Sequence, residues 1–291
     1  MKLLRVKSLW EYVSFEGSPL AIRLGQDSGA LFARIAEAGY GAVESPLPVP
    51  EQEELFKELL RTNGLRFIAQ TLTDGPDHAA SFRAQAERAA SFDPMFLVSQ
   101  SAKDSDSLSD QLHYFEQALQ TEAAIGLAVA HETHRGRALY TPWNATELLN
   151  RLASLKLNAD FSHWCCVTES LLEGHASALQ LACSRSIHIH GRVGHAEGPQ
   201  VADPRAPEYA RELAVHEAWW KQIVCARLAA GADTITFTPE FGPPGYMPTL
   251  PFTRQPVANL WEVNLWMAER FEALAMTWAE EFAREGAVEH E

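Results

Sequence analysis

The sequence predicts an α/β fold in which eight parallel strands close into one single-domain (β/α)8 barrel, a TIM barrel. Its 291 residues match the usual size of such a barrel. Strand-like and helix-like segments alternate eight times along the chain, which indicates a parallel sheet. An open doubly wound sheet is the alternative, but the GxGxxG and GxxxxGKS/T phosphate loops typical of it are missing. We therefore expect residues 1–291 to form one domain.

Each repeat of the pattern is a short apolar strand followed by a helix with apolar residues three and four positions apart. The strands are predicted at residues 3–9, 40–44, 65–71, 95–101, 127–131, 155–161, 186–193 and 234–238. The helices are predicted at residues 28–38, 51–62, 78–91, 107–124, 144–154, 168–182, 207–230 and 257–284. Four of these helices end just before a glycine, as expected for helix ends: Gly39, Gly64, Gly126 and Gly231. Asn144, with Glu147 three residues later, predicts the start of the fifth helix.

Composition restricts the partners and the compartment. The formal net charge is −14, which disfavours nucleic acid as a partner. Neither an apolar leader nor a run of about 18 apolar residues is present, so we expect no membrane association. The four cysteines, Cys165, Cys166, Cys183 and Cys225, form neither a CxxC pair nor a spaced framework. We expect free thiols in the reducing cytoplasm.

The last four predicted strands carry polar side chains on one face and apolar side chains on the other. Alternation places Glu132, Asp160, His190 and Glu240 on the polar faces, which should point into the barrel. Three inward carboxylates are costly to bury unless a cation neutralises them. Three carboxylates and one imidazole suit a single divalent metal ion. The oxygen-rich set favours Mn²⁺ or Mg²⁺, and Co²⁺ and Zn²⁺ stay open.

Four short motifs lie at these strand ends: HETHR at 131–135, DFSH at 160–163, HIH at 188–190 and PEFG at 239–242. With them, the chain resembles the xylose isomerase-like TIM barrels, also called the sugar phosphate isomerase/epimerase superfamily. The resemblance implies that Glu132, Asp160, His190 and Glu240 are the metal ligands. The chain departs from the family at Arg192, where members often carry a lysine.

The resemblance also implies an activity. The expected enzyme is a metal-dependent isomerase or epimerase of a small carbohydrate or keto-sugar, working through a cis-enediolate. Glu132 and Glu240 are the candidates for moving the proton, and His163, Arg192 and His134 are the candidates for binding substrate oxygens. A lyase or dehydratase acting on a polyol or keto-glycoside is the alternative. A phosphodiesterase like endonuclease IV is less expected, because the charge of −14 opposes a DNA groove.

Three tryptophans, Trp261, Trp266 and Trp278, recur along the last predicted helix. Such a stripe is typical of a helix packed on the barrel wall. Part of it can instead form the interface of a homo-oligomer, which the family resemblance makes reasonable.

Overall fold

The predicted barrel is confirmed by the computed structural model, which describes residues 1–17 and 20–288. Eight parallel strands close in the order β1-β10-β9-β8-β7-β6-β5-β4. Their bounds are β1 Lys2–Ser8, β4 Ala42–Pro46, β5 Arg66–Leu72, β6 Leu97–Gln100, β7 Val129–Glu132, β8 Leu157–Ala159, β9 Ser186–His190 and β10 Thr234–Thr238. Because all eight strands are parallel, their carboxyl ends open on one face of the barrel, where active sites of this architecture form.

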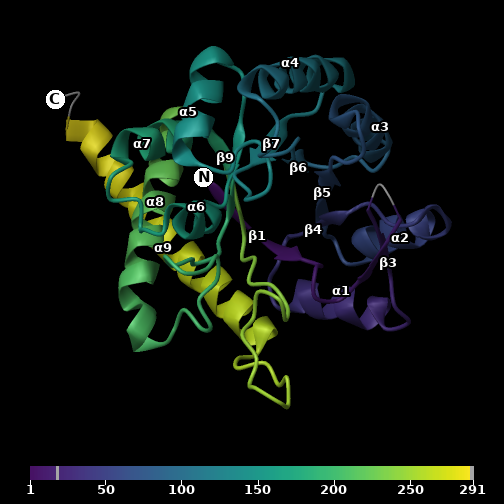
Figure 1. The fold of residues 1–291 in the computed structure, drawn as a ribbon. Coiled ribbons are helices and arrows are strands. Elements are labelled where there is room, and N and C mark those ends of the chain that lie inside the picture. The colour runs from purple at the N-terminus through teal and green to yellow at the C-terminus, as the bar shows by residue number, and fades with distance from the viewer. Residues whose placement is uncertain (18–19, 289–291) are drawn as a thin grey trace.

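Helices surround the strands (Figure 1). Their bounds are α1 Ser28–Glu37, α2 Glu53–Thr62, α3 His78–Ala90, α4 Leu108–Ile125, α5 Pro142–Arg151, α6 Phe161–Thr168, α7 Ala176–Arg185, α8 Ala210–Ala229 and α9 Leu260–Val288, with single 3₁₀ turns at Pro50–Gln52 and Pro207–Tyr209. Helix α4 shows why the boundaries fall where they do. The Ser107 side chain accepts the Asp110 N–H at its start, and Gly126 ends it with a φ of 71°.

Two apolar regions hold the barrel together. The larger lies between the strands and the helices, where Phe237 and Phe271 stack with ring centroids 3.8 Å apart. The smaller fills the barrel interior with Leu4, Val6, Ala42, Ile68, Phe96, Val98 and Ala130. These interior residues come from or adjoin β1 and β4–β7. The interior of β8–β10 is polar instead, so the two sides of the barrel differ in character.

Two helix predictions were wrong. The helix expected at residues 168–182 begins only at Ala176, as α7, and a separate helix that was not predicted, α6, precedes it. Asp160 caps α6 by accepting the Ser162 N–H, and Glu169 ends that helix in the left-handed region with a φ of 50°. The start expected at Asn144 lies earlier, because the Thr141 side chain accepts the Asn144 N–H and Pro142 occupies the first helical position.

The strand limits also differ, and one hairpin was not predicted. Strands expected at 95–101 and 186–193 are shorter in the structure, and β7 runs one residue past its expected end to include Glu132. Between β1 and α1, β2 (Ser14–Glu16) pairs antiparallel with β3 (Ala21–Arg23). Sequence patterns miss such a hairpin because its strands have only three residues each.

The tryptophans of α9 pack against residues of the same chain. Trp278 is buried, and the guanidinium carbon of Arg34 lies 3.7 Å from the centre of the Trp261 ring. The homo-oligomer interface therefore stays a prediction. Among the described residues, no helix is both long and apolar enough to cross a membrane.

Candidate metal centre

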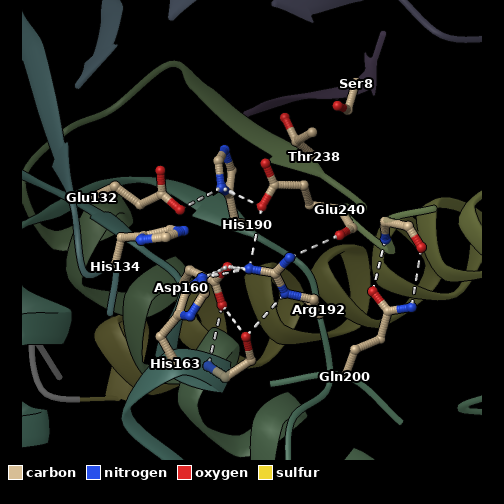
Figure 2. A network of polar contacts seen from close by, with 12 residues as sticks. Ser8, Glu132, His134, Asp160, His163, His190, Arg192, Gln200, Thr238 and Glu240 are labelled. Atoms are coloured by element: carbon tan, nitrogen blue, oxygen red, sulfur yellow. Dashed lines mark hydrogen bonds and ion pairs between the residues drawn. The ribbon is translucent and has the colours of Figure 1, made fainter. Parts of the chain in front are cut away.

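The four predicted ligands converge at the carboxyl ends of β7–β10 (Figure 2). Glu132, Asp160, His190 and Glu240 each offer a ligand atom, and these atoms all lie within 4.8 Å of one another. All four side chains are buried. They belong to four neighbouring strands or to the residues that directly follow them, so the parallel register brings together groups up to 108 positions apart in the sequence.

His190 is oriented by a carboxylate that the sequence analysis did not select. Its Nε2 lies 2.8 Å from Oε1 of Glu44, and because a carboxylate only accepts hydrogen bonds, Nε2 carries the proton. The other ring nitrogen, Nδ1, faces the centre, 2.9 Å from Glu240 Oε2 and 3.6 Å from Glu132 Oε1. Burial opposes the charged form of His190, but the charges of Glu240 and Glu44 outweigh it and raise its pKa well above the ordinary value, so both ring nitrogens carry protons here. A metal ion would replace the proton on Nδ1, the nitrogen that faces the centre.

Glu44 is a buried hub of hydrogen bonds on β4. Its two oxygens accept from Gln70 Nε2 at 2.9 Å and from Thr238 Oγ1 at 2.5 Å, and Nε2 of His188 lies 3.2 Å away. Glu44, His188 and His190 also lie close enough to hold an ion. Since hydrogen bonds already occupy Glu44, we assign this group the task of orienting His190.

A signal for Glu44 was present in the sequence. The strand predicted at residues 40–44 ends on this carboxylate, and each of the last four predicted strands likewise carries a carboxylate or an imidazole at or near its end. Its partners His188 and Thr238 lie 144 and 194 positions away along the chain. No local pattern can reveal that pairing.

Glu132 has room for a cation. Both of its carboxylate oxygens are buried without a hydrogen-bond partner among the described residues, as is Nδ1 of His190. Burial opposes the charged form of Glu132, but the neighbouring His190, together with the charges of His134 and Arg192, outweighs it and holds the pKa at about 2. A buried carboxylate that stays ionised and lacks hydrogen-bond donors is a suitable ligand for a divalent cation.

Arg192 shares the same carboxylates. Its guanidinium donates to Oδ2 of Asp160 and lies 3.6 Å from Oε2 of Glu240 (Figure 2). The side chain is 1% exposed, so it is a fixed positive charge inside the candidate site. The structure therefore places Arg192 among the predicted ligands, and a metal ion would compete with it for Asp160 and Glu240.

Asp160 is the most heavily occupied of the four ligands. Its Oδ1 accepts hydrogen bonds from the Ser162 hydroxyl and backbone N–H, while Oδ2 accepts from Arg192. Burial, opposed by the charge of Arg192 and reinforced by the charges of Glu240 and Glu132, raises the pKa of this carboxyl to about 6. A bound cation would relieve this crowding of negative charge.

The two other predicted substrate-binding residues lie beside the ligands. The rings of His134 and His163 have centroids 4.0 Å apart. His163 Nε2 accepts from Arg192 at 2.7 Å, which puts its proton on Nδ1, a buried atom without a partner among the described residues. Burial and the charge of His134 hold the pKa of His163 well below its ordinary value, so the ring is neutral.

A cavity of about 320 Å³ opens above this centre. Glu132, His134, Arg192 and Glu240 form its charged side. The volume is at the lower end of the range for small-molecule sites, roughly 300–1,000 Å³. The predicted substrate-binding residue His163 does not line this cavity directly; it lies behind His134 and Arg192.

No protein-family model and no curated protein matches the chain by sequence. Solved structures match over most of the chain. A 3-keto-D-glucoside 4-epimerase from E. coli has a TM-score of 0.58 at 14% identity, covering 94% of this chain and 99% of its own. A probable 3-DHS dehydratase from Bacillus anthracis has a TM-score of 0.58 at 14% identity, with 91% and 97% covered. Endonuclease IV from Thermus thermophilus has a TM-score of 0.53 at 14% identity, with 96% and 99% covered.

These likenesses define the class of fold. The chain has the fold of the xylose isomerase-like TIM barrels, as the sequence motifs indicated. Proteins that share this fold include epimerases, a dehydratase and endonuclease IV, so the fold alone does not give the reaction. The chemistry has to be argued from the side chains of the site.

Proposed function

We propose that this protein is a divalent-metal-dependent isomerase or epimerase of a small carbohydrate or keto-sugar. The observation that carries the proposal is the convergence of four ligand atoms, from Glu132, Asp160, His190 and Glu240, within 4.8 Å of one another. The unpartnered oxygens of Glu132 add that a cation fits this place. The proposed compartment is the reducing cytoplasm, since all four cysteines are free thiols.

These four residues would hold the ion, with Mn²⁺ or Mg²⁺ favoured by three carboxylates. A metal bound there would supply Lewis-acid chemistry, polarising a substrate carbonyl and neutralising negative charge on its oxygen. In the protein, Glu44 keeps the Nε2 proton of His190 away from the centre. The ligand nitrogen is therefore presented in a fixed direction.

Proton transfer falls to the two glutamates. Glu132 and Glu240 both line the cavity, so each can reach a carbon held between them. In the proposed reaction, one glutamate removes the proton from the carbon beside the carbonyl, and a proton then returns from the other side or to the neighbouring carbon. His134 and Arg192, which also line the cavity, would hold substrate oxygens, with His163 behind them.

A lyase or dehydratase is the second candidate. The first proton abstraction would be the same, and the departure of a group on the next carbon would replace reprotonation. The specific observation that favours it is Arg192, a fixed cation beside Glu240 that can stabilise a leaving oxygen. An unsaturated product would identify this reaction.

A phosphodiesterase acting on DNA is less well supported. Among the described residues, the four-ligand group shares His190 with the group of Glu44 and His188, and Glu132 with the group of His134 and His163. The proposal therefore assigns one ion to the four-ligand group, where the sequence predicted it. A net charge of −14 opposes a duplex at this surface. We therefore propose a small molecule, and no nucleic acid, as the partner.

The test combines metal analysis with isotope exchange. We expect about one divalent metal per chain by elemental mass spectrometry after incubation with Mn²⁺. We also expect solvent deuterium at the carbon beside the carbonyl of at least one ketose from a broad panel. Glu240→Gln should lose both, whereas Glu54→Gln, the same change on the exposed surface of α2, should lose neither. Wild-type protein with neither bound metal nor exchange would refute the proposal.

A further inference from the structure

The cavity above the candidate metal centre has two chemically different sides. The charged side is formed by Glu132, His134, Arg192 and Glu240 at the ends of β7–β10. The facing side comes from the loop after β1, the β2–β3 hairpin and the ends of β4 and β5. Its apolar residues are Trp10, Phe15, Leu20, Pro46 and Leu72. We call these five residues the apolar wall.

Trp10 is fixed in the apolar wall by a glycine. A Cβ atom on Gly242 would lie 2.4 Å from the indole of Trp10, so the ring packs directly against a backbone that has no side chain. Gln200 holds that backbone from both sides, since its Oε1 accepts the Gly242 N–H at 2.7 Å and its Nε2 donates to the Gly242 carbonyl at 3.3 Å. The indole also contacts the ring of Tyr246 in a T-shaped arrangement, with ring centroids 5.0 Å apart.

The hairpin that carries Phe15 is tied to the barrel as well. Ile22 of β3 exchanges backbone hydrogen bonds with the segment after β4, donating to Leu47 at 3.0 Å and accepting from Val49 at 2.9 Å. Arg23 pairs with Glu16 within the hairpin at 2.6 Å. Phe15 is 38% exposed, although it faces a cavity that belongs to a candidate active site. A held aromatic ring with this exposure is ready to contact a ligand.

The third observation is that the side chains on the apolar wall's side of the cavity are uncharged. Besides the five apolar side chains, the neutral amides of Gln70 and Gln100 line this side. Arg192 is the one permanently positive side chain among the cavity residues of the described chain, and Asp160 and Glu240 already neutralise it. A phosphate or carboxylate placed against this wall would have no counter-charge there.

We infer that the substrate carries an uncharged substituent with an apolar face, an aryl group or a second sugar ring, packed against Trp10, Phe15 and Leu20. The preferred class is then a keto-glycoside and not a free ketose or a sugar phosphate. The position of the reacting carbons at Glu132 and Glu240 rests on the proposed function. The substituent site rests on the apolar wall alone.

Binding of non-reacting glycosides to the full-length protein tests this inference. Isothermal titration calorimetry, with and without Mn²⁺, would compare phenyl β-D-glucopyranoside, methyl β-D-glucopyranoside and glucose 6-phosphate. We expect the phenyl glucoside to bind at least about tenfold more tightly than the methyl glucoside, and glucose 6-phosphate to bind no better than the methyl glucoside. Equal binding of the two glucosides, preference for the phosphate, or no binding of any probe would each overturn the inference.

Two wall variants and one control locate the preference. Trp10→Ala and Phe15→Ala should each reduce the phenyl-to-methyl ratio to about threefold or less. Phe15 is partly exposed, so that variant keeps the test valid even if Trp10→Ala fails to fold. Trp143→Ala, which removes an aromatic side chain that is 53% exposed outside this cavity, should leave the ratio unchanged. A ratio that survives both wall variants would also overturn the inference.

The two proposals fail in different ways. A protein that keeps the phenyl preference, but binds no metal and exchanges no substrate hydrogen, loses the proposed function and keeps the substituent site. A protein that exchanges deuterium into free ketoses and shows no phenyl preference keeps the proposed function and loses the substituent site.

Discussion

The two sides of this barrel are built from the same strand–helix unit, but the interior is apolar on one side and polar on the other. On β1 and β4–β6, inward positions hold side chains such as Val6, Ile68 and Val98, and the strands end near the apolar wall. On β7–β10, the residues at or just beyond the strand ends are carboxylates, imidazoles and Arg192. One side of the barrel therefore supplies apolar packing, and the other holds charges in fixed places.

This division has an energetic reason. Buried carboxylates are tolerated only where hydrogen bonds and opposite charges compensate their lost hydration. Here Arg192 and His190 supply that compensation, and Glu44 reaches across from β4 to fix the imidazole. Glu44 is thus the point where the apolar side supports the charged one. The comparison predicts large functional effects from changes on β7–β10 and smaller ones from changes on the opposite side.

The largest expected effect is on catalysis. Glu132→Gln removes a ligand charge and a candidate proton-transfer group together, so kcat/KM for solvent-deuterium exchange should fall about 10³-fold or more. Gln100→Leu changes a cavity residue at the end of β6, and its effect should stay within about tenfold and lie mainly in KM. The rate of deuterium incorporation, measured by NMR on quenched samples, gives kcat/KM and KM for both variants. Equal losses in the two variants would show that the two sides share the chemistry.

Replacing Arg192 should alter stability in a metal-dependent way. Arg192→Met leaves Asp160 and Glu240 without their buried counter-charge, which typically costs about 3–5 kcal/mol when no metal is bound. Saturating Mn²⁺ should restore most of that loss, because the ion takes over the same oxygens. Urea unfolding with and without Mn²⁺ measures it. If the variant bound Mn²⁺ more than tenfold more weakly than wild type, Arg192 would support the metal and not compete with it.

Acid should weaken the charged side of the barrel first. His216 of α8 is buried and accepts the Gly194 N–H through Nε2 at 3.2 Å, and burial lowers its pKa to about 4. The ordinary value is 6.5, so between pH 6.5 and 4 the unfolded chain binds a proton that the folded protein does not. Stability from this group is complete above pH 6.5 and is lost as pH falls towards 4, by about 2 kcal/mol at pH 5.

Hydrogen exchange can show where the acid effect lies. At pH 5, amide protection corrected for intrinsic rates should fall in β8 and β9, near Gly194, before it falls in β5. In urea unfolding, His216→Gln should lose about 2 kcal/mol of the difference between pH 7.5 and pH 5. A pH dependence that is unchanged in this variant would assign the acid sensitivity to other groups.

The sequence was enough to predict the barrel and the position of the ligand set. Strand–helix alternation gave the fold, and alternation within strands put Glu132, Asp160, His190 and Glu240 on one surface, which the structure brings together. Their catalytic and ligand roles stay predictions. What the sequence could not provide depends on contacts between distant segments, such as Arg192 entering the ligand set and Trp10 packing on Gly242.

The errors in the predicted helix limits arise where a helix cap or a turn overrides the apolar periodicity of the sequence. Apolar periodicity between residues 168 and 182 was consistent with a helix, but Glu169 in the left-handed region separates α6 from α7. The side chain of Asp160 has two structural roles. It caps α6 by accepting the Ser162 N–H, and it also accepts a hydrogen bond from the Arg192 guanidinium. Periodicity reports burial, and it does not report where a cap or a turn interrupts the chain.

The last predicted effect concerns Glu44, the residue that joins the two sides. Glu44→Gln keeps the shape of the side chain but weakens the acceptor for the Nε2 proton of His190, so the dissociation constant for Mn²⁺ should rise about 10–100-fold. Free Mn²⁺ measured by electron paramagnetic resonance gives that constant. Thr236→Val, which changes a contact of His188 and leaves Glu44 intact, is the matched control. A lowered melting temperature with an unchanged Mn²⁺ constant would mean that Glu44 only stabilises the barrel; a raised constant in a protein that melts normally would make it the residue that positions His190 for metal binding.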